Sequence, residues 1–167
     1  MYDELTEVDI QKMREELDHR IRVLRPQLIE DVKIARGFGD LSENFEYKCA
    51  KQEKNRNESR IRYLERMIRT AKIITVESKR DVVGLFDTVL VYNEKLKKEM
   101  TLRIVTTLRQ DVLQGRISKE SPVGTALLGR QLGERVLVHV NDTLEYYLEI
   151  RSIEKGEDDT SLEIRSY

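Results

Sequence analysis

The chain has 167 residues, of which 39% are hydrophobic and 37% charged, and its formal net charge is −1. This length fits one large domain or two small ones, and the many charges favour a long solvent-exposed helical element over a single compact globule. A near-neutral chain is not a general binder of polyanions, and its single cysteine, Cys49, excludes an internal disulfide and a cysteine-based zinc site.

The first 36 residues carry a helical pattern. Apolar residues recur every three or four positions, which predicts one helix over about residues 6 to 36. Thr6 is the expected N-cap, with Asp9 in the following turn. Pro26 should kink this helix without ending it, because the apolar pattern continues beyond it. The apolar stripe consists of Ile10, Met13, Leu17, Ile21, Leu24, Leu28, Val32 and Ala35.

A turn and a second helix follow. Gly37 and Gly39 can both adopt positive φ, so a tight turn is expected over residues 37 to 41. A second helix is predicted from about residue 42 to residue 74, with a polar middle and an apolar stripe near its end. The two helices should form an antiparallel coiled-coil hairpin about 45 Å long. Cys49 is expected in the core of this hairpin, near Val32.

The second predicted helix is locally basic. Nine basic and three acidic residues lie between Lys48 and Lys72, which suggests a restricted contact with phosphate or with an acidic partner. An ordinary solvated helix face is the alternative interpretation. Because no basic segment followed by an apolar run begins the chain and no stretch approaches ~20 apolar residues, we expect a cytoplasmic protein without membrane contact.

The pattern changes to strands in the second half. Alternation and β-branched residues predict strands at 83–92, 100–106, 135–140 and 144–153. A short helix is expected over residues 121 to 128, with Ser121 as N-cap and Gly129 closing it. The predicted fold class is therefore α+β, with a hairpin domain at 1–78 (tip 37–45) and a mostly antiparallel sheet domain at 79–167, extended from about residue 156. The boundary should lie near residues 77 to 83.

Two acids stand at the predicted hairpin tip. Asp40 and Glu43 lie one helical turn apart and should project to the same side. Mg²⁺ prefers oxygen ligands and often takes only one or two from a protein, so the pair is a candidate half-site for this ion. An aspartate N-cap followed three residues later by a glutamate is also a capping box. A plain charged loop is the third interpretation.

Two motifs resemble one family. Residues 35–47, A-R-G-F-G-D-L-S-E-N-F-E-Y, look like the tip signature A-R-x-x-G-D-L-x-E-N-x-E-Y of the Gre transcript-cleavage factors. Residues 121–130, S-P-V-G-T-A-L-L-G-R, resemble a conserved stretch of their C-terminal domain. The resemblance covers about residues 3 to 155 and implies a C-terminal FKBP-like domain that docks on RNA polymerase at the rim of its secondary channel, with a hairpin that enters the channel.

The resemblance also implies residue roles. Asp40 and Glu43 would help the catalytic Mg²⁺ of polymerase and its attacking water to cleave the 3′ end of backtracked RNA. The protein would then be no enzyme itself, would bind no stable cofactor alone, and would be a monomer when free. Residues with other implied roles are Gly39, Leu41, Ser42 and Asn44 (tip support), Arg36 and Lys51 (contact with the nascent RNA 3′ end), and Ser121, Pro122, Val123, Leu127 and Gly129 (polymerase docking).

Several alternatives remain open at this point. A Gre-like protein that only blocks the channel would share the fold and the docking, whereas an FKBP-like domain raises the possibility of prolyl isomerisation, for which the aromatic residues are few and scattered. Phe45 replaces the small residue that is usual in the family after the E-N step, and it should pack on Phe38 or else offer a stacking surface. The extension could add an edge strand through residues 161–165 or stay loose.

Overall fold

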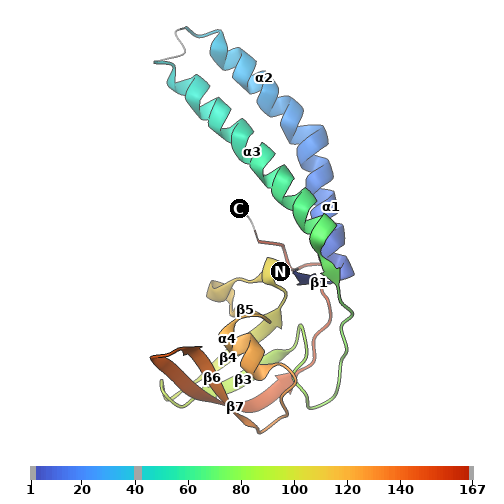
Figure 1. Ribbon diagram of the computed structural model, residues 1–167, viewed down its shortest axis with the longest axis vertical. Helices are drawn as coiled ribbons and strands as arrows, with labels where there is room; N and C mark the ends of the chain where they lie inside the picture. Colours follow the sequence, from blue (N-terminus) through green and yellow to red (C-terminus); the bar gives the residue numbers. More distant parts are fainter. Residues whose placement is uncertain (1–2, 40–42, 166–167) are drawn as a thin grey trace. The chain divides into compact units, whose positions relative to one another are not determined.

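The computed structural model describes residues 3–39 and 43–165, and the chain divides into two units (Figure 1). The helical unit contains Ile10–Ala71, and the sheet unit contains Glu4–Asp9 together with the chain from Lys72 onward. The sequence predicted the boundary between the two domains near residues 77 to 83. It gave no sign that residues 4–9 belong to the sheet unit, where β1 (Glu4–Leu5) pairs in parallel with β2 (Lys72–Ile73).

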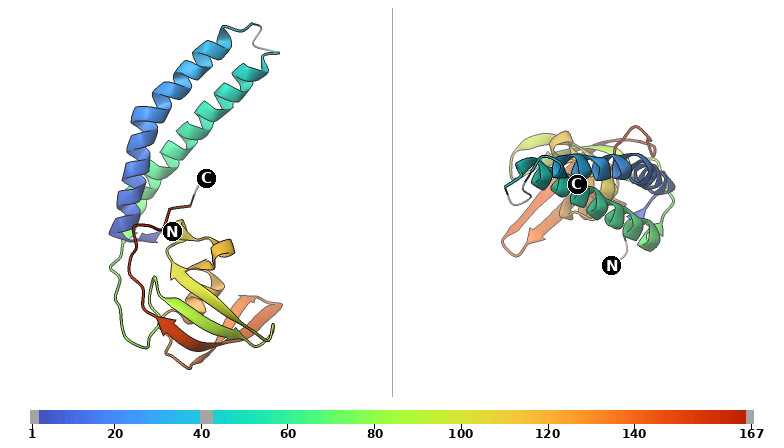
Figure 2. Two further views of the ribbon diagram at one scale, coloured as in Figure 1. Left: turned by 180° about the vertical axis from the view of Figure 1, so that it is seen from behind. Right: turned by 90° about the horizontal axis from the view of Figure 1, so that it is seen from above.

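The helical hairpin has two antiparallel helical arms. The first consists of α1 (Glu7–His19), a π-helical turn (Arg20–Leu24) and α2 (Arg25–Arg36), and the second is α3 (Phe45–Thr70). In Figures 1 and 2, α2 and α3 lie side by side. Every residue of the predicted apolar stripe is buried or half-buried, which confirms that the stripe is the inner face of a hairpin. Thr6 and Asp9 exchange hydrogen bonds at the start of α1, as a capping pair does.

The π turn explains how the first helix passes Pro26. A proline lacks an N–H and crowds the carbonyl of the preceding turn. The backbone N–H of Arg25 donates to the carbonyl of Arg20, five residues back instead of four, so the turn before Pro26 is widened. The predicted continuation of the helix is confirmed, and its irregularity is a π turn.

A polar layer fills the middle of the hairpin, where the sequence of α3 lacks apolar residues. Glu16 accepts two hydrogen bonds from Arg60, both 2.9 Å, and one of 2.7 Å from Arg20. Burial alone would raise the pKa of Glu16, but the hydrogen bonds from Arg60 and Arg20 outweigh it and hold the pKa below its usual value. Arg60 is only 4% exposed, so it does not belong to a solvent-facing basic stripe. Asn57 is also buried and accepts from Arg20 at 3.0 Å.

The sheet unit is a curled five-stranded mixed sheet with the order β5-β4-β3-β7-β6. Its strands are β3 (Thr88–Asn93), β4 (Lys98–Val105), β5 (Arg116–Ser118), β6 (Arg135–Asn141) and β7 (Leu144–Glu154). The predicted strands at 100–106, 135–140 and 144–153 are confirmed. The first predicted strand begins five residues late, because Phe86 has a φ of 69° and forms a turn. The sheet is not purely antiparallel, since β4 and β5 run parallel.

One short helix, α4 (Pro122–Leu127), packs against β6, and Ser121 caps it by accepting from the N–H of Gly124. This helix and its cap are as predicted. The core lies between α4 and the inner face of the sheet, with Val89, Ile104, Leu127 and Ile150 fully buried. Within residues 3–39 and 43–165, no helix is long and apolar enough to cross a membrane.

The C-terminal extension neither adds a strand nor stays loose. Leu162 packs against the core of the sheet unit, and the N–H of Gly156 donates to Asp87 at 3.0 Å. The buried guanidinium of Arg109 binds the extension through the carboxylate of Asp158 (2.6 Å) and the carbonyl of Asp159 (3.1 Å). Both predicted alternatives are therefore wrong, because an ion pair and an apolar contact fix an irregular segment.

Arg109 also binds the start of the chain. Its Nε donates to Asp9 at 2.7 Å, and neither side chain has any exposed surface. Phe86 lies under the guanidinium, 5.0 Å from its centre to the ring centroid. One buried cation thus holds three segments of the sheet unit: residues 6–9, residues 107–109 and the extension.

Candidate functional site

The hairpin tip is held by Asn44. Its side-chain oxygen accepts from the N–H of Tyr47 at 3.0 Å and so caps α3, while its amide nitrogen donates to the carbonyl of Ala35 at 2.7 Å, near the end of α2. A single side chain therefore joins the two helix ends that flank the turn. Gly39 has a φ of 135°, which favours glycine, whereas Gly37 stays right-handed, so only one of the two glycines uses its expected freedom.

Glu43 precedes α3 and is exposed. Because Asn44 is the N-cap of α3, Glu43 is not the third residue of that helix, and the capping-box interpretation of Glu43 is wrong. Its side chain lines a hollow of about 680 Å³ together with Phe38, Asn44, Phe45 and Glu46. The other predicted tip residues, Asp40, Leu41 and Ser42, lie outside the described residues.

Two predictions about side chains near the tip are wrong. Phe38 is 67% exposed and Phe45 is 76% exposed, so the rings do not form the expected packed pair. Their exposure leaves the stacking-surface alternative for Phe45. Cys49 is exposed and does not lie in the hairpin core, because α3 begins at Phe45 with a phase that turns this residue outward.

Tyr47 lies between the two cations that were predicted to contact RNA. Its ring centroid is 5.6 Å from the guanidinium carbon of Arg36 and 6.0 Å from Nζ of Lys51. A hydrogen bond from Arg36, and then the nearby positive charges, lower the pKa of the Tyr47 hydroxyl. The structure therefore brings Arg36 and Lys51 together across the hairpin. Sequence reasoning assigned no role to Tyr47, although its position one helical turn before Lys51 was a usable signal.

Some of the predicted docking residues are exposed, and others lie beneath the surface and support it. Pro122 and Gly129 are exposed, Ser121 and Val123 are half-buried, and Leu127 is fully buried. Leu127 therefore supports this face from beneath and cannot touch a partner. Leu128, which was not predicted, is 37% exposed on the same face. Leu128 and Gly129 also line a groove of about 370 Å³ that runs along Val82–Leu85.

Carboxylate oxygens are the ligands that Mg²⁺ prefers, and the exposed carboxylate of Glu43 fits such an ion. Among the residues that the structure describes, no three His, Cys, Asp or Glu side chains are grouped so that they could hold a metal. The chemistry available at the described part of the tip is thus that of two exposed acids, Glu43 and Glu46, and of the cationic pair Arg36 and Lys51.

Family comparisons cover nearly the whole chain. The model of the N-terminal region of transcription elongation factors GreA and GreB matches residues 4–73, and the model of their C-terminal region matches residues 71–155. The chain belongs to the GreA/GreB family of transcription elongation factors. The tip signature at residues 35–47 lies within the matched N-terminal region.

Individual Gre relatives agree in extent. GreA of Thermoanaerobacter pseudethanolicus is 44% identical over 137 residues, 81% of this chain and 87% of that protein. GreA of Streptococcus agalactiae is 38% identical over 152 residues, 90% and 94% of the two chains. Among solved structures, GreA factor homolog 1 (Gfh1) of Thermus thermophilus is 24% identical, with a TM-score of 0.43 over 93% of this chain and 100% of that one.

The Gre tip should depend on Asn44 for its local order. We expect Asn44→Ala to cost ~1–2 kcal/mol locally, because the substitution removes a cap and a bond between the helix ends. The amide of Tyr47 should then exchange its hydrogen about fivefold faster or more, as measured by NMR. Asn55→Ala, an exposed site on the same helix, serves as the control and should leave that exchange unchanged. Equal exchange rates in both variants would contradict this role for Asn44.

Proposed function

We propose that this Gre-family protein binds RNA polymerase, inserts its hairpin into the secondary channel and stimulates cleavage of the 3′ end of backtracked RNA. The observation that carries the proposal is the exposed carboxylate of Glu43, which lies before α3 and is not used to cap it. A carboxylate that makes no cap contact and lies directly before a capped helix start is available to a reaction centre outside the chain. The family to which the chain belongs supports the same conclusion.

The acids of the tip would act only together with the polymerase. Asp40 and Glu43 would hold Mg²⁺ there, and the bound ion would supply an activated water and stabilise charge on the displaced oxygen. The chain's own part is to present the carboxylates, since a pair of acids leaves most of the coordination shell to water or to other ligands. The protein is therefore a helper of another enzyme's active centre.

The cationic pair beside the acids would hold the RNA. Arg36 and Lys51 face one tyrosine ring, which limits how far either side chain can turn away. Positive charges at this place favour a phosphate of the nascent 3′ segment. They would position the scissile end near Glu43 without taking part in bond breaking.

The sheet unit would supply docking through the exposed part of its Ser121–Gly129 motif. Gly124 has no room for a side chain, because a Cβ there would overlap the backbone of Ser118. This close approach fixes the turn that exposes Pro122 and, further along, Leu128. We propose this face as the contact with the rim of the secondary channel.

The test is a cleavage assay on stalled elongation complexes with 3′-labelled RNA. The proposal predicts release of short 3′ fragments that requires both the protein and Mg²⁺. Pro122→Ala combined with Leu128→Ser should weaken binding to polymerase, while excess protein restores cleavage. Tight binding without any fragment release by the unmodified protein would contradict the proposal and indicate a channel inhibitor.

A further inference from the structure

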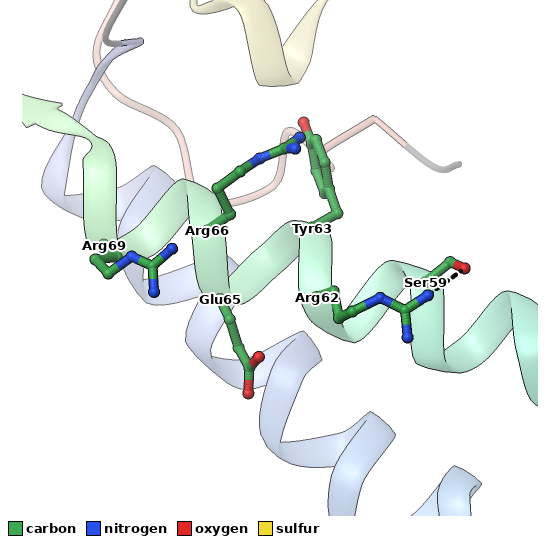
Figure 3. Close-up of a pocket in the computed structure, with 6 residues that line it drawn as sticks. All are labelled: Ser59, Arg62, Tyr63, Glu65, Arg66 and Arg69. Carbon is green, nitrogen blue, oxygen red and sulfur yellow. Dashed lines mark hydrogen bonds between the residues drawn. The ribbon is translucent and has the colours of Figure 1, made fainter.

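The outer face of α3 carries a cationic surface that the proposed chemistry does not use. Toward the end of the helix, six residues surround a hollow of about 540 Å³, which we call the arginine hollow (Figure 3). The residues that line the arginine hollow are Ser59, Arg62, Tyr63, Glu65, Arg66 and Arg69. All of them belong to one helix, so the hollow does not depend on how the two units are placed.

The three arginines follow from helical spacing. Arg62, Arg66 and Arg69 are separated by four and three residues, so their side chains leave the same face of α3. All three are exposed, whereas Ile61, Leu64 and Met67 on the opposite face are buried in the hairpin. The arginines therefore contribute nothing to the hydrophobic core, and their guanidinium groups are accessible to a partner.

Two of the guanidinium groups are partly positioned. Nη2 of Arg62 donates to Oγ of Ser59 at 3.0 Å, as the dashed line in Figure 3 shows. The guanidinium carbon of Arg66 lies 5.7 Å from the ring centroid of Tyr63. Side chains that are held in this way lose less conformational entropy when a partner binds. Among the described residues, no acid forms a salt bridge with Arg62, Arg66 or Arg69.

We infer that the arginine hollow binds an acidic polypeptide segment of RNA polymerase. This inference rests on the proposed function only in so far as polymerase is the partner of the hairpin. The hollow carries three positive charges and one negative charge, so it is complementary to a surface with excess carboxylates. A planar guanidinium offers two parallel donors that match the two oxygens of an aspartate or glutamate.

The composition favours a protein over a nucleic acid as the occupant. Arginine and tyrosine are the residues that dominate protein–protein hot spots. Glu65 also lines the hollow, where it would repel a phosphate chain but could pair with a basic residue of a polypeptide. The face of Tyr63 is already near Arg60 and Arg66, at 5.1 and 5.7 Å, and this leaves less of the ring for stacking with a base.

The first test removes the charges. The variant Arg62→Gln/Arg66→Gln/Arg69→Gln keeps good helix formers on an exposed face, and circular dichroism checks that its helix content is unchanged. Its Kd for RNA polymerase without nucleic acid should rise about tenfold or more, with a weaker dependence on salt. The matched control is Arg14→Gln/Arg22→Gln/Lys33→Gln, which removes three exposed charges from the first arm of the hairpin. It should change Kd less than about twofold.

The second test identifies the occupant. A photo-crosslinking residue in place of Arg66 should form adducts with polymerase peptides rich in Asp and Glu, in complexes with and without RNA. Adducts with RNA alone, or a loss of affinity only when RNA is present, would overturn the inference in favour of a nucleic acid. Equal Kd values for the two triple variants would overturn it as well.

These outcomes are separate from those of the cleavage proposal. At saturating concentration the Arg62/Arg66/Arg69 variant should restore cleavage to the unmodified level, because the hollow affects occupancy and not chemistry. If the unmodified protein bound polymerase without any cleavage, the proposed function would fail while the effect of the arginines on Kd still stood. A variant that binds normally but never supports cleavage would instead contradict the docking role of the hollow.

Discussion

Replacing Glu43 with alanine should lower Mg²⁺-dependent RNA cleavage by polymerase by at least about 100-fold, because even partners outside a metal's inner shell contribute 10–100-fold. The exposed position of Glu43 means that the substitution removes no contact that the fold needs. Asp40→Ala should have an effect of the same order. Single-turnover rates of 3′ fragment release at saturating protein measure the effect, and a binding assay in parallel should show an unchanged Kd.

A charge-matched control separates local chemistry from general electrostatics. Glu53 is an exposed acid in α3, ten residues beyond Glu43, and forms a surface pair with Arg56 at 2.8 Å. Polymerase with the Glu53→Ala variant should therefore cleave RNA at the normal rate. Excess Mg²⁺ should partly restore cleavage in the Glu43 variant, since weaker ligation is offset by concentration. Loss of polymerase binding by Glu43→Ala, or normal cleavage, would rule out the assigned role.

Arg109→Ala should destabilise the sheet unit by ~3–5 kcal/mol, which is the usual consequence of breaking a buried ion pair. The substitution leaves the carboxylate of Asp9 buried without its cation and removes the anchor of the C-terminal extension. We expect a clear drop in the thermal midpoint of the sheet signal in circular dichroism. Near-native stability of this variant would show that water reaches Asp9 and that the pair is not sealed.

A second variant tests the cause. Replacing both partners, with Asp9→Asn and Arg109→Met, should recover part of the lost stability, because the buried charge of Asp9 is removed together with its cation. The recovery should be partial, because the carboxylate of Asp158 still loses the cation that binds it. Arg130→Ala provides the matched control, since Arg130 is 52% exposed in its pair with Glu134 and should change stability by less than about 0.5 kcal/mol. A double variant that is less stable to unfolding than Arg109→Ala alone would contradict this explanation.

The hairpin was predictable because its information is local. The apolar spacing from Ile10 to Ala35 specifies one buried face whatever the partner, and Thr6 and Ser121 carry recognisable capping chemistry. Longer strands such as β7 were found for the same reason. The three-residue β5 was missed, because its pairing depends on β4 and not on any pattern of its own.

The remaining features depend on contacts between residues far apart in the chain. Arg60 looked like part of a solvated basic run until Glu16, 44 positions earlier, was seen to bind it. In the tip, Asn44 and Glu43 are neighbours with different duties, and only the hydrogen bond to Ala35 shows which of them belongs to the scaffold. Composition and spacing cannot separate such roles, because both residues suit a helix start.

The contact between Arg109 and the extension has a practical side for protein engineers. The family model ends at residue 155, so a shortened gene designed on that boundary would omit Asp158 and Asp159. The truncated product would leave the Arg109 guanidinium without these partners and would uncover the apolar surface that Leu162 covers, so it should be less stable than the full chain. A fluorescent label can be attached at the exposed thiol of Cys49, which leaves the C-terminal extension intact.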